Sequence, residues 1–132
     1  MDDRSEARKV IASEALKQIQ AEQEYQELMP TIRYQGKAAL ERLVKVAQGH
    51  SGQSRYIARF LLGCYNGSRF PFDLTDFRCI DRQLFDDCLT VLRMDFQPEK
   101  DVHEYVVNGS EVFERLAVDW NVEDIEQLKL MK

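Results

Sequence analysis

Apolar residues recur at three- and four-residue steps along most of this chain, which is the spacing of one face of an α-helix. Residues 5–29 contain no Gly or Pro and are rich in Ala, Glu, Gln and Lys, so we predict a helix there. Its apolar stripe consists of Ala7, Val10, Ile11, Ala15 and Ile19. The stripe then fades, because polar residues occupy positions 22, 23 and 26. We expect this helix either to dock by its first turns and project by its last, or to pair with a second copy in a homodimer through residues 5–29.

The same periodicity predicts further helices over about 37–48, 53–65, 82–95 and 110–120, and a capping pattern begins another after Asn121. Pro30 is expected to end the first helix, because the residue before a proline is disfavoured in helical conformation. The segment 82–95 is apolar around more than half of its circumference and follows Asp81, a good N-cap. We therefore expect this segment to be the central helix, packed by the other three.

Two connections carry apolar residues outside these helices. The segment 67–80 contains Phe70, Phe72, Leu74 and Phe77, which we expect to pack down against the helices. The segment 102–107 alternates between apolar and polar residues and ends at a turn, which is typical of a short strand. No second strand is predicted to pair with it, and an isolated strand is unstable.

These elements define a mainly α fold, a single compact domain of five or six helices with at most one short strand or hairpin near 103–107. Residues 1–30 form an N-terminal amphipathic helix that is expected to project, and residues 31–132 form the helical globular domain. With 44% hydrophobic and 31% charged residues, the composition is that of a globular protein rather than a disordered one.

The sequence also restricts the cellular compartment in which we expect the protein. The longest uncharged apolar run is far shorter than the ~20 residues that span a bilayer, and the acidic start does not resemble a secretory signal. The three cysteines, Cys64, Cys79 and Cys88, form no C-x-x-C pair and are odd in number. That pattern favours a reducing environment in which thiols serve as small apolar side chains. We expect a cytoplasmic protein with no membrane partner.

Charge is segregated along the chain. Residues 31–72 contain seven Lys and Arg and one acid, a net charge of +6, whereas residues 73–132 contain fifteen acids and seven bases, a net charge of −8. The first thirty residues add −3. Such segregation either holds the fold together internally or presents two surfaces of opposite sign to other molecules.

The basic block supplies the candidate nucleic-acid contacts, which are Lys37, Lys45, Arg55, Arg59 and Arg69. Arg55 and Arg59 are four residues apart and share a helix face, and two helices joined by a glycine-containing turn outline a DNA-reading module. The turn is longer than usual, however, and the acidic remainder of the chain would repel phosphate. The alternative, which we favour, is that the arginines pair with Asp73, Asp76, Asp86 or Asp87 inside the fold.

No catalytic, cofactor-binding or metal signature is present in the sequence. The carboxylates between residues 73 and 87 match no calcium loop, and Asp81 already has a capping role. His50 and His103 are the only histidines and lack a nucleophile at a recognisable spacing. An enzyme would need a pocket in which Asp73 or Asp76 meets one of these histidines, and we predict neither a catalytic site nor a cofactor.

One block of the chain resembles a known family. The residues that carry the resemblance are Gly52-Gln53-Ser54-Arg55, Phe60-Leu61-Leu62, Asn66, Phe72-Asp73-Leu74-Thr75-Asp76 and Asp81. The family consists of short uncharacterised proteobacterial proteins, typically encoded on plasmids, integrative elements and prophages, and the resemblance covers about residues 38–120. The chain departs from it at Cys64-Tyr65-Asn66, where the family often has Trp-Trp-Asn. No activity is established for the family, so the resemblance assigns no residue a role and implies only a bacterial, mobile-element context.

These observations lead to three hypotheses of function. The first is a non-enzymatic interaction or accessory protein of a bacterial mobile element, which binds another protein through its acidic half or its N-terminal helix. The second is a nucleic-acid-binding protein that uses residues 31–72. The third is an enzyme of a class that the sequence does not reveal.

Overall fold

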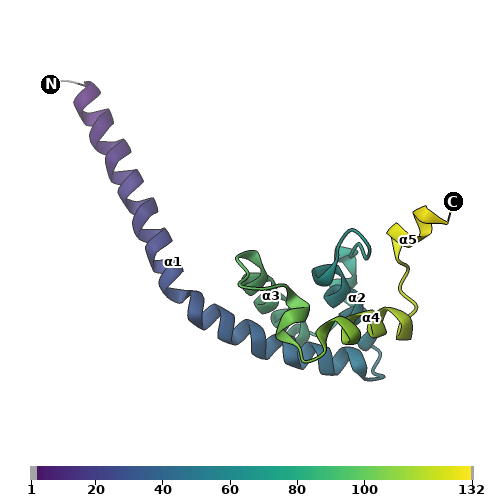
Figure 1. Cartoon of the computed structure of the whole chain (residues 1–132). Coiled ribbons are helices and arrows are strands. Elements are labelled where there is room, and N and C mark those ends of the chain that lie inside the picture. The colour runs from purple at the N-terminus through teal and green to yellow at the C-terminus, as the bar shows by residue number, and fades with distance from the viewer. Residues whose placement is uncertain (1–2, 132) are drawn as a thin grey trace.

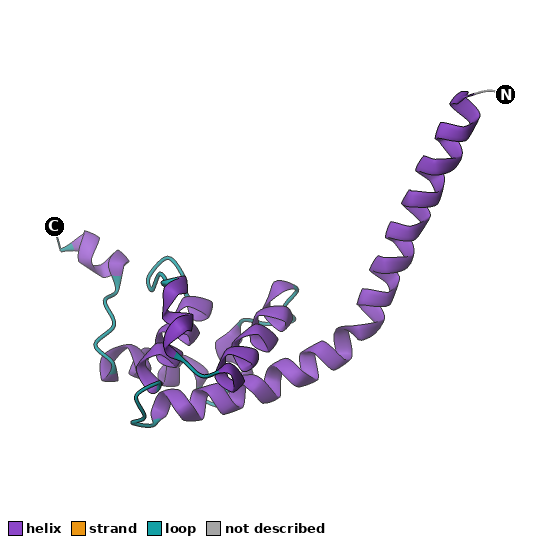
Figure 2. Ribbon diagram, turned by 180° about the vertical axis from the view of Figure 1, so that it is seen from behind, coloured by secondary structure: helices purple, strands orange, loops and turns teal. Residues whose placement is uncertain are grey.

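The computed structural model describes residues 3–131, which form five α-helices and two short 3-10 helices (Figures 1 and 2). The elements are α1 (Asp3–Gln48), α2 (Ser54–Tyr65), η1 (Leu74–Cys79), α3 (Arg82–Phe96), η2 (Val102–Tyr105), α4 (Gly109–Asp119) and α5 (Ile125–Leu130). Within residues 3–131 there is no strand. The prediction of a mainly helical fold is confirmed.

The first element differs from the sequence prediction, because one continuous helix of 46 residues replaces the two expected over 5–29 and 37–48. Pro30 lies inside α1, so the prediction that it ends the first helix is wrong. A proline in a helix interior removes one hydrogen bond and bends the helix, but it does not have to end it. The bend is visible in α1 in Figure 1. Met29 is buried beside it and Ile32 packs against the core, so tertiary contacts hold the chain helical across the proline.

Helix α1 has two parts with different surroundings. Residues 3–28, here called the arm, are exposed apart from the half-buried Tyr25. Residues 29–131, here called the body, contain all of the side chains that are buried among the described residues. At the base of the arm, Gln26 Nε2 donates a hydrogen bond of 3.2 Å to Gln97 Oε1. The expectation that the first helix docks by its first turns is therefore wrong, since its last turns dock and its first turns project.

The core of the body forms around the second half of α1. Helices α2 and α3 both pack against it, and α4 packs against α2. The largest fully buried side chains include Leu40, Leu43, Leu61, Val91 and Phe113. Gly36 permits a close contact between α1 and α3, because a Cβ there would lie 2.5 Å from Met94 Cβ on α3. The prediction that 82–95 is the central helix is wrong, because the segment after Pro30 occupies that position.

The two connections pack as short helical turns. In the first, Phe70 is buried and Phe72 and Phe77 pack against the core as predicted, whereas Leu74 is exposed. In the second, residues 102–105 form η2, so the predicted strand is wrong. Asp101 and Glu104 cap this turn reciprocally. Gly109 follows it, and a side chain there would overlap the His103 carbonyl group.

Hydrogen bonds tie the C-terminal residues to the rest of the body. Trp120 Nε1 donates a hydrogen bond of 2.8 Å to the Ala47 carbonyl oxygen, which belongs to the last turn of α1, where carbonyl groups lack helical partners. The Ile125 amide donates to the Arg69 carbonyl oxygen at 2.9 Å, which ties the start of α5 to the segment after α2. Asp124 caps α5 by accepting from the Gln127 amide.

Candidate functional site

Ion pairs join the basic block of the sequence to the acidic block. Four of the seven basic side chains between residues 31 and 72 bind carboxylates of residues 73–132. The pairs are Arg33 with Glu99 at 3.1 Å, Arg42 with Asp87 at 2.8 Å, Arg59 with Asp76 at 3.6 Å and Arg69 with Glu114 at 2.7 Å. Because each pair links segments distant in sequence, the segregation of charge helps to specify which segments lie together.

The densest cluster surrounds Arg69. Its guanidinium group binds Glu114 through two hydrogen bonds of 2.7 Å and binds Asp124 at 2.8 Å. Tyr65 Oη also donates to Glu114, at 2.6 Å. These bonds, above all those from Arg69, lower the pKa of Glu114 to about 2. The pKa of Asp124 is lowered as well, first by the Gln127 amide and then by Arg69.

The predicted nucleic-acid contacts are therefore divided between two environments. Arg59 and Arg69 are paired with acids, as the favoured alternative expected, although Arg69 binds Glu114 and Asp124 rather than the acids considered. Lys37, Lys45 and Arg55 are exposed, and no ion pair to them is present in residues 3–131.

The three exposed cations lie on two helices, and an acid interrupts the two lysines. Lys37 and Lys45 lie on the same face of α1, but Glu41 lies between them at four-residue steps. Arg55 lies on α2, where it donates to Tyr56 Oη at 2.8 Å and stacks over that ring.

The residues considered for catalysis have structural roles. Asp73 caps η1 by accepting from the Thr75 amide, and Asp81 caps α3 by accepting from the Leu84 amide. His103 packs edge to face against Tyr65. His50 borders a cavity of about 290 Å³ whose carboxylate is Asp119, not one of the acids considered. Among the described residues, no three His, Cys, Asp or Glu side chains are placed to hold a metal ion.

Two of the three thiols lie in environments that suppress reactivity. Burial raises the pKa of Cys64 to about 12 and that of Cys88 to about 12. Both groups are therefore protonated at neutral pH, and a thiol is a poor nucleophile compared with a thiolate. Cys79 is exposed.

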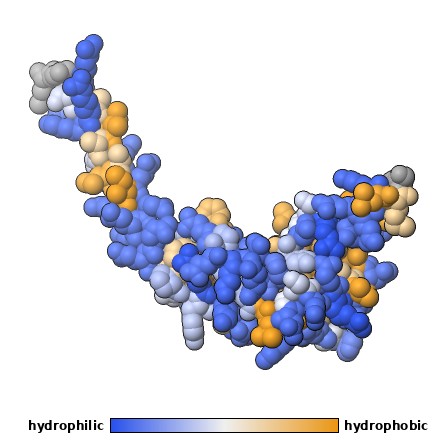
Figure 3. All heavy atoms as spheres, in the orientation of Figure 1, coloured by the Kyte–Doolittle hydropathy of each residue, from blue (hydrophilic) through white to orange (hydrophobic). Residues whose placement is uncertain are grey.

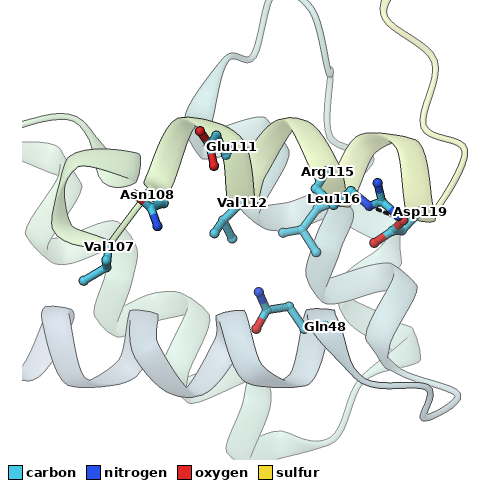
Figure 4. A pocket seen from close by; sticks show the side chains of 8 residues that line it. All are labelled: Gln48, Val107, Asn108, Glu111, Val112, Arg115, Leu116 and Asp119. Atoms are coloured by element: carbon cyan, nitrogen blue, oxygen red, sulfur yellow. Dashed lines mark hydrogen bonds and ion pairs between the residues drawn. The ribbon is translucent and has the colours of Figure 1, made fainter.

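Several cavities of about 280–390 Å³ open on the body, among them the following two. The first, of about 390 Å³, lies between the end of α1 and α4, and Figure 4 shows its lining side chains. It is open to solvent, and its Arg115 is paired with Asp119 at 3.0 Å. The second, of about 280 Å³, is lined by aromatic and aliphatic side chains and by Asp95, whose pKa is raised by burial. Neither brings together an acid, a base and a nucleophile.

The arm presents exposed apolar side chains that have no partner within the described residues. Val10, Ile11, Leu16 and Ile19 are each more than half exposed, and no element of the body lies against them. Figure 3 shows an apolar band on the arm, with polar residues between the band and the body. The sequence identified Val10, Ile11 and Ile19 as part of an apolar stripe and left two occupants open for it, the protein's own core or a second copy.

Sequence reasoning missed several of the ion-pair partners. Arg33, Arg42, Glu114 and Asp124 were not predicted to pair with particular residues. The segregated charge was the available signal, but it does not tell which acid approaches which base, because that depends on how the helices pack.

The fold and its surfaces define a small helical module, held together by a buried core and long-range ion pairs, with one exposed amphipathic arm. The chain belongs to the family of unknown function DUF7673, whose model matches residues 37–121. The match begins within α1, ends just after α4, and leaves the arm and α5 outside. No curated protein and no solved structure matches the chain. Over residues 3–131, no helix combines the length and apolar character needed to cross a bilayer.

Proposed function

We propose that this is a non-enzymatic protein-interaction protein and that the arm is its binding surface. The observation that carries the proposal is the exposure of Val10, Ile11, Leu16 and Ile19 along one stretch of helix. Fully burying such a side chain is worth about 1.5–3 kcal/mol. An amphipathic helix that lays its apolar stripe in a partner's groove is a common mode of peptide recognition.

The ion pairs favour the arm over the acidic half as the binding surface. Five acids of residues 73–132 already bind basic side chains of the preceding block. Their charge is compensated within the body and is less available to a basic partner. The arm has no such internal partner for its apolar stripe.

The same pairs favour a protein over a nucleic acid as the partner. Of the seven basic side chains in residues 31–72, Lys37, Lys45 and Arg55 are left for phosphate contacts. Affinity for DNA or RNA depends on the number of phosphates that a protein neutralises. Three separated cations on a chain of net charge −5 would give weak binding.

The resemblance described above supports a biological context for this interaction. We place the protein in a proteobacterial cytoplasm and assign it an accessory role for a plasmid, integrative element or prophage. In that setting, the partner would be a protein of the element, a protein of the host or a second copy of the chain.

The test compares the full chain with a variant whose stripe is polar, Ile11→Glu with Leu16→Glu. The matched control is Ser13→Glu with Gln20→Glu, which adds the same charge at exposed arm positions outside the stripe. We expect association, measured as self-association or as capture of a stoichiometric partner, to be lost in the stripe variant and kept in the control. Association that survives the stripe change, or no association of any kind by the unaltered chain, would reject the proposal.

A further inference from the structure

Along one face of the arm, the order of side-chain types is the same from either end, except that the charged residues at the two ends have opposite signs. Arg8, Ile11, Ala15, Ile19 and Glu22 follow one another at three- or four-residue steps, so they lie along one side of α1. Ala15 is at the centre, an isoleucine lies four residues away on each side, and a charged residue lies seven residues away on each side. The charge is positive toward the N-terminus and negative toward the body.

We propose that the arm pairs with the arm of a second copy, antiparallel, with the two helices crossing at Ala15. This inference rests on the proposed function and names the partner of that surface. In this arrangement Ile11 of each copy packs against Ile19 of the other. A two-fold axis passes through the crossing, so each contact occurs twice and the dimer is closed.

Charge determines the direction of the pair. In the antiparallel register, Arg8 of each copy faces Glu22 of the other, which gives two attractive pairs. In a parallel pair, Arg8 would face Arg8 and Glu22 would face Glu22, which is repulsive at both ends. Glu22 accepts a 2.8 Å hydrogen bond from Gln26 of its own chain, but a neutral amide leaves its charge uncompensated.

The centre of the face suits a close crossing. Ala15 has the smallest side chain that still favours a helix, so two backbones can approach there. Ala12 and Leu16 lie beside it and widen the apolar contact on one flank. The acidic and basic ends of the face are exposed, as are the isoleucines.

The bend at Pro30 and the length of the arm leave room for both bodies. The crossing lies fifteen residues from Pro30, or about 22 Å at 1.5 Å per residue. The two bodies would therefore be held about 45 Å apart along the paired arms. In this register residue 3 of one copy lies opposite residue 27 of the other, so each arm ends where the partner's body begins.

The first experiment is sedimentation of the full chain over roughly 1–200 μM, the range in which small interfaces associate. We expect a reversible monomer–dimer equilibrium. Arg8→Glu and Glu22→Arg should each weaken the dimer about tenfold, because two weak attractions become repulsions. The double variant Arg8→Glu with Glu22→Arg should return to within about threefold of the original affinity. A parallel dimer would show no such recovery, because the double variant again places like charges opposite each other.

The second experiment uses disulfide formation to establish the register. In a Cys79→Ser background, which removes the exposed native thiol, Ile11→Cys and Ile19→Cys chains are mixed and oxidised. Antiparallel pairing gives the mixed disulfide and leaves each chain alone uncrosslinked. Disulfides between two Ile11→Cys chains would indicate a parallel pair and overturn the inference.

The outcomes separate this inference from the proposed function. A chain that stays monomeric throughout, but captures a different protein through its stripe, overturns the self-pairing and leaves the interaction function standing. A dimer insensitive to both the charge exchange and the polar stripe variant overturns both. Recovery in the double variant together with the mixed disulfide supports both.

Discussion

Leu16 and Leu43 belong to the same helix, yet Leu16 is 56% exposed and Leu43 is fully buried. The difference lies in what surrounds each half of α1. After Pro30 the helix meets α2 and α3, and its apolar residues become the centre of the core. Residues 3–28, by contrast, are exposed apart from the half-buried Tyr25, with a hydrogen bond to Gln97 at the base of the arm. The same amphipathic pattern therefore stabilises the fold in one half and remains available for binding in the other.

The largest expected contrast comes from removing the two leucines. Leu43→Ala should lower the free energy of unfolding by about 3 kcal/mol, because it leaves a cavity in the core. Leu16→Ala should change that free energy by less than about 0.5 kcal/mol, since the side chain makes no tertiary contact. Urea denaturation of both variants at a concentration where the chain is monomeric measures the difference. Similar losses in the two variants would mean that the arm folds back on the body.

The second contrast compares two arginines. Arg69→Gln should cost about 2 kcal/mol, because it removes two carboxylate partners at once and leaves Glu114 without its cation. Arg8→Gln should be neutral for unfolding of the monomer, because Arg8 makes no ion pair within residues 3–131. Thermal denaturation with matched protein concentrations provides the comparison. An Arg69 variant as stable as the parent would show that the cluster contributes nothing.

The third contrast depends on pH. The pKa of Glu114 is lowered to about 2 from its ordinary value of 4.5, so its stabilising effect is present above about pH 4.5 and is lost as the pH falls toward 2. Glu114→Gln should therefore be less stable than the parent at neutral pH by about 1 kcal/mol, a value reduced because the Glu114 side chain is 44% exposed. The two proteins should converge in acid. Glu14→Gln in the arm is the control and should track the parent at every pH, and a constant gap for Glu114→Gln would contradict the assignment.

The smallest expected effect concerns nucleic acid. Labelled single- and double-stranded DNA and RNA, titrated by fluorescence anisotropy at several salt concentrations, should show weak binding at most, because three basic side chains of residues 31–72 are free of ion pairs. Arg55→Ala should change it little. A log–log salt slope of about −3 or steeper, with micromolar affinity, would mean that several phosphates are neutralised. That result would favour the nucleic-acid hypothesis over the proposed function.

The sequence predicted those parts of the fold that depend on local pattern. The apolar periodicity of residues 53–65, 82–95 and 110–120 corresponds to α2, α3 and α4 within a residue or two. Asp81 caps α3 as expected, because an aspartate before an apolar-periodic segment can satisfy the first amides of a helix.

The errors arose where tertiary contacts override a local rule. Pro30 ends a helix in isolation, but the packing of Met29 and Ile32 on either side compensates for the lost hydrogen bond. The segment 102–107 alternates like a strand, yet Asp101 and Glu104 form a capping box that was readable as a helical turn. Which end of the first helix packs against the body depends on where the other helices lie. The apolar periodicity of the sequence alone does not contain that information.

Because α1 bends at Pro30, a small change in the bend angle moves the tip of the arm over a large distance. Twenty-six residues of helix extend about 39 Å, so a change of 10° in the bend moves the tip by about 7 Å. Pro30 therefore determines the direction in which the exposed apolar side chains of the arm are presented to a partner. Small changes in the packing around Met29 would produce large displacements of a partner bound to the arm.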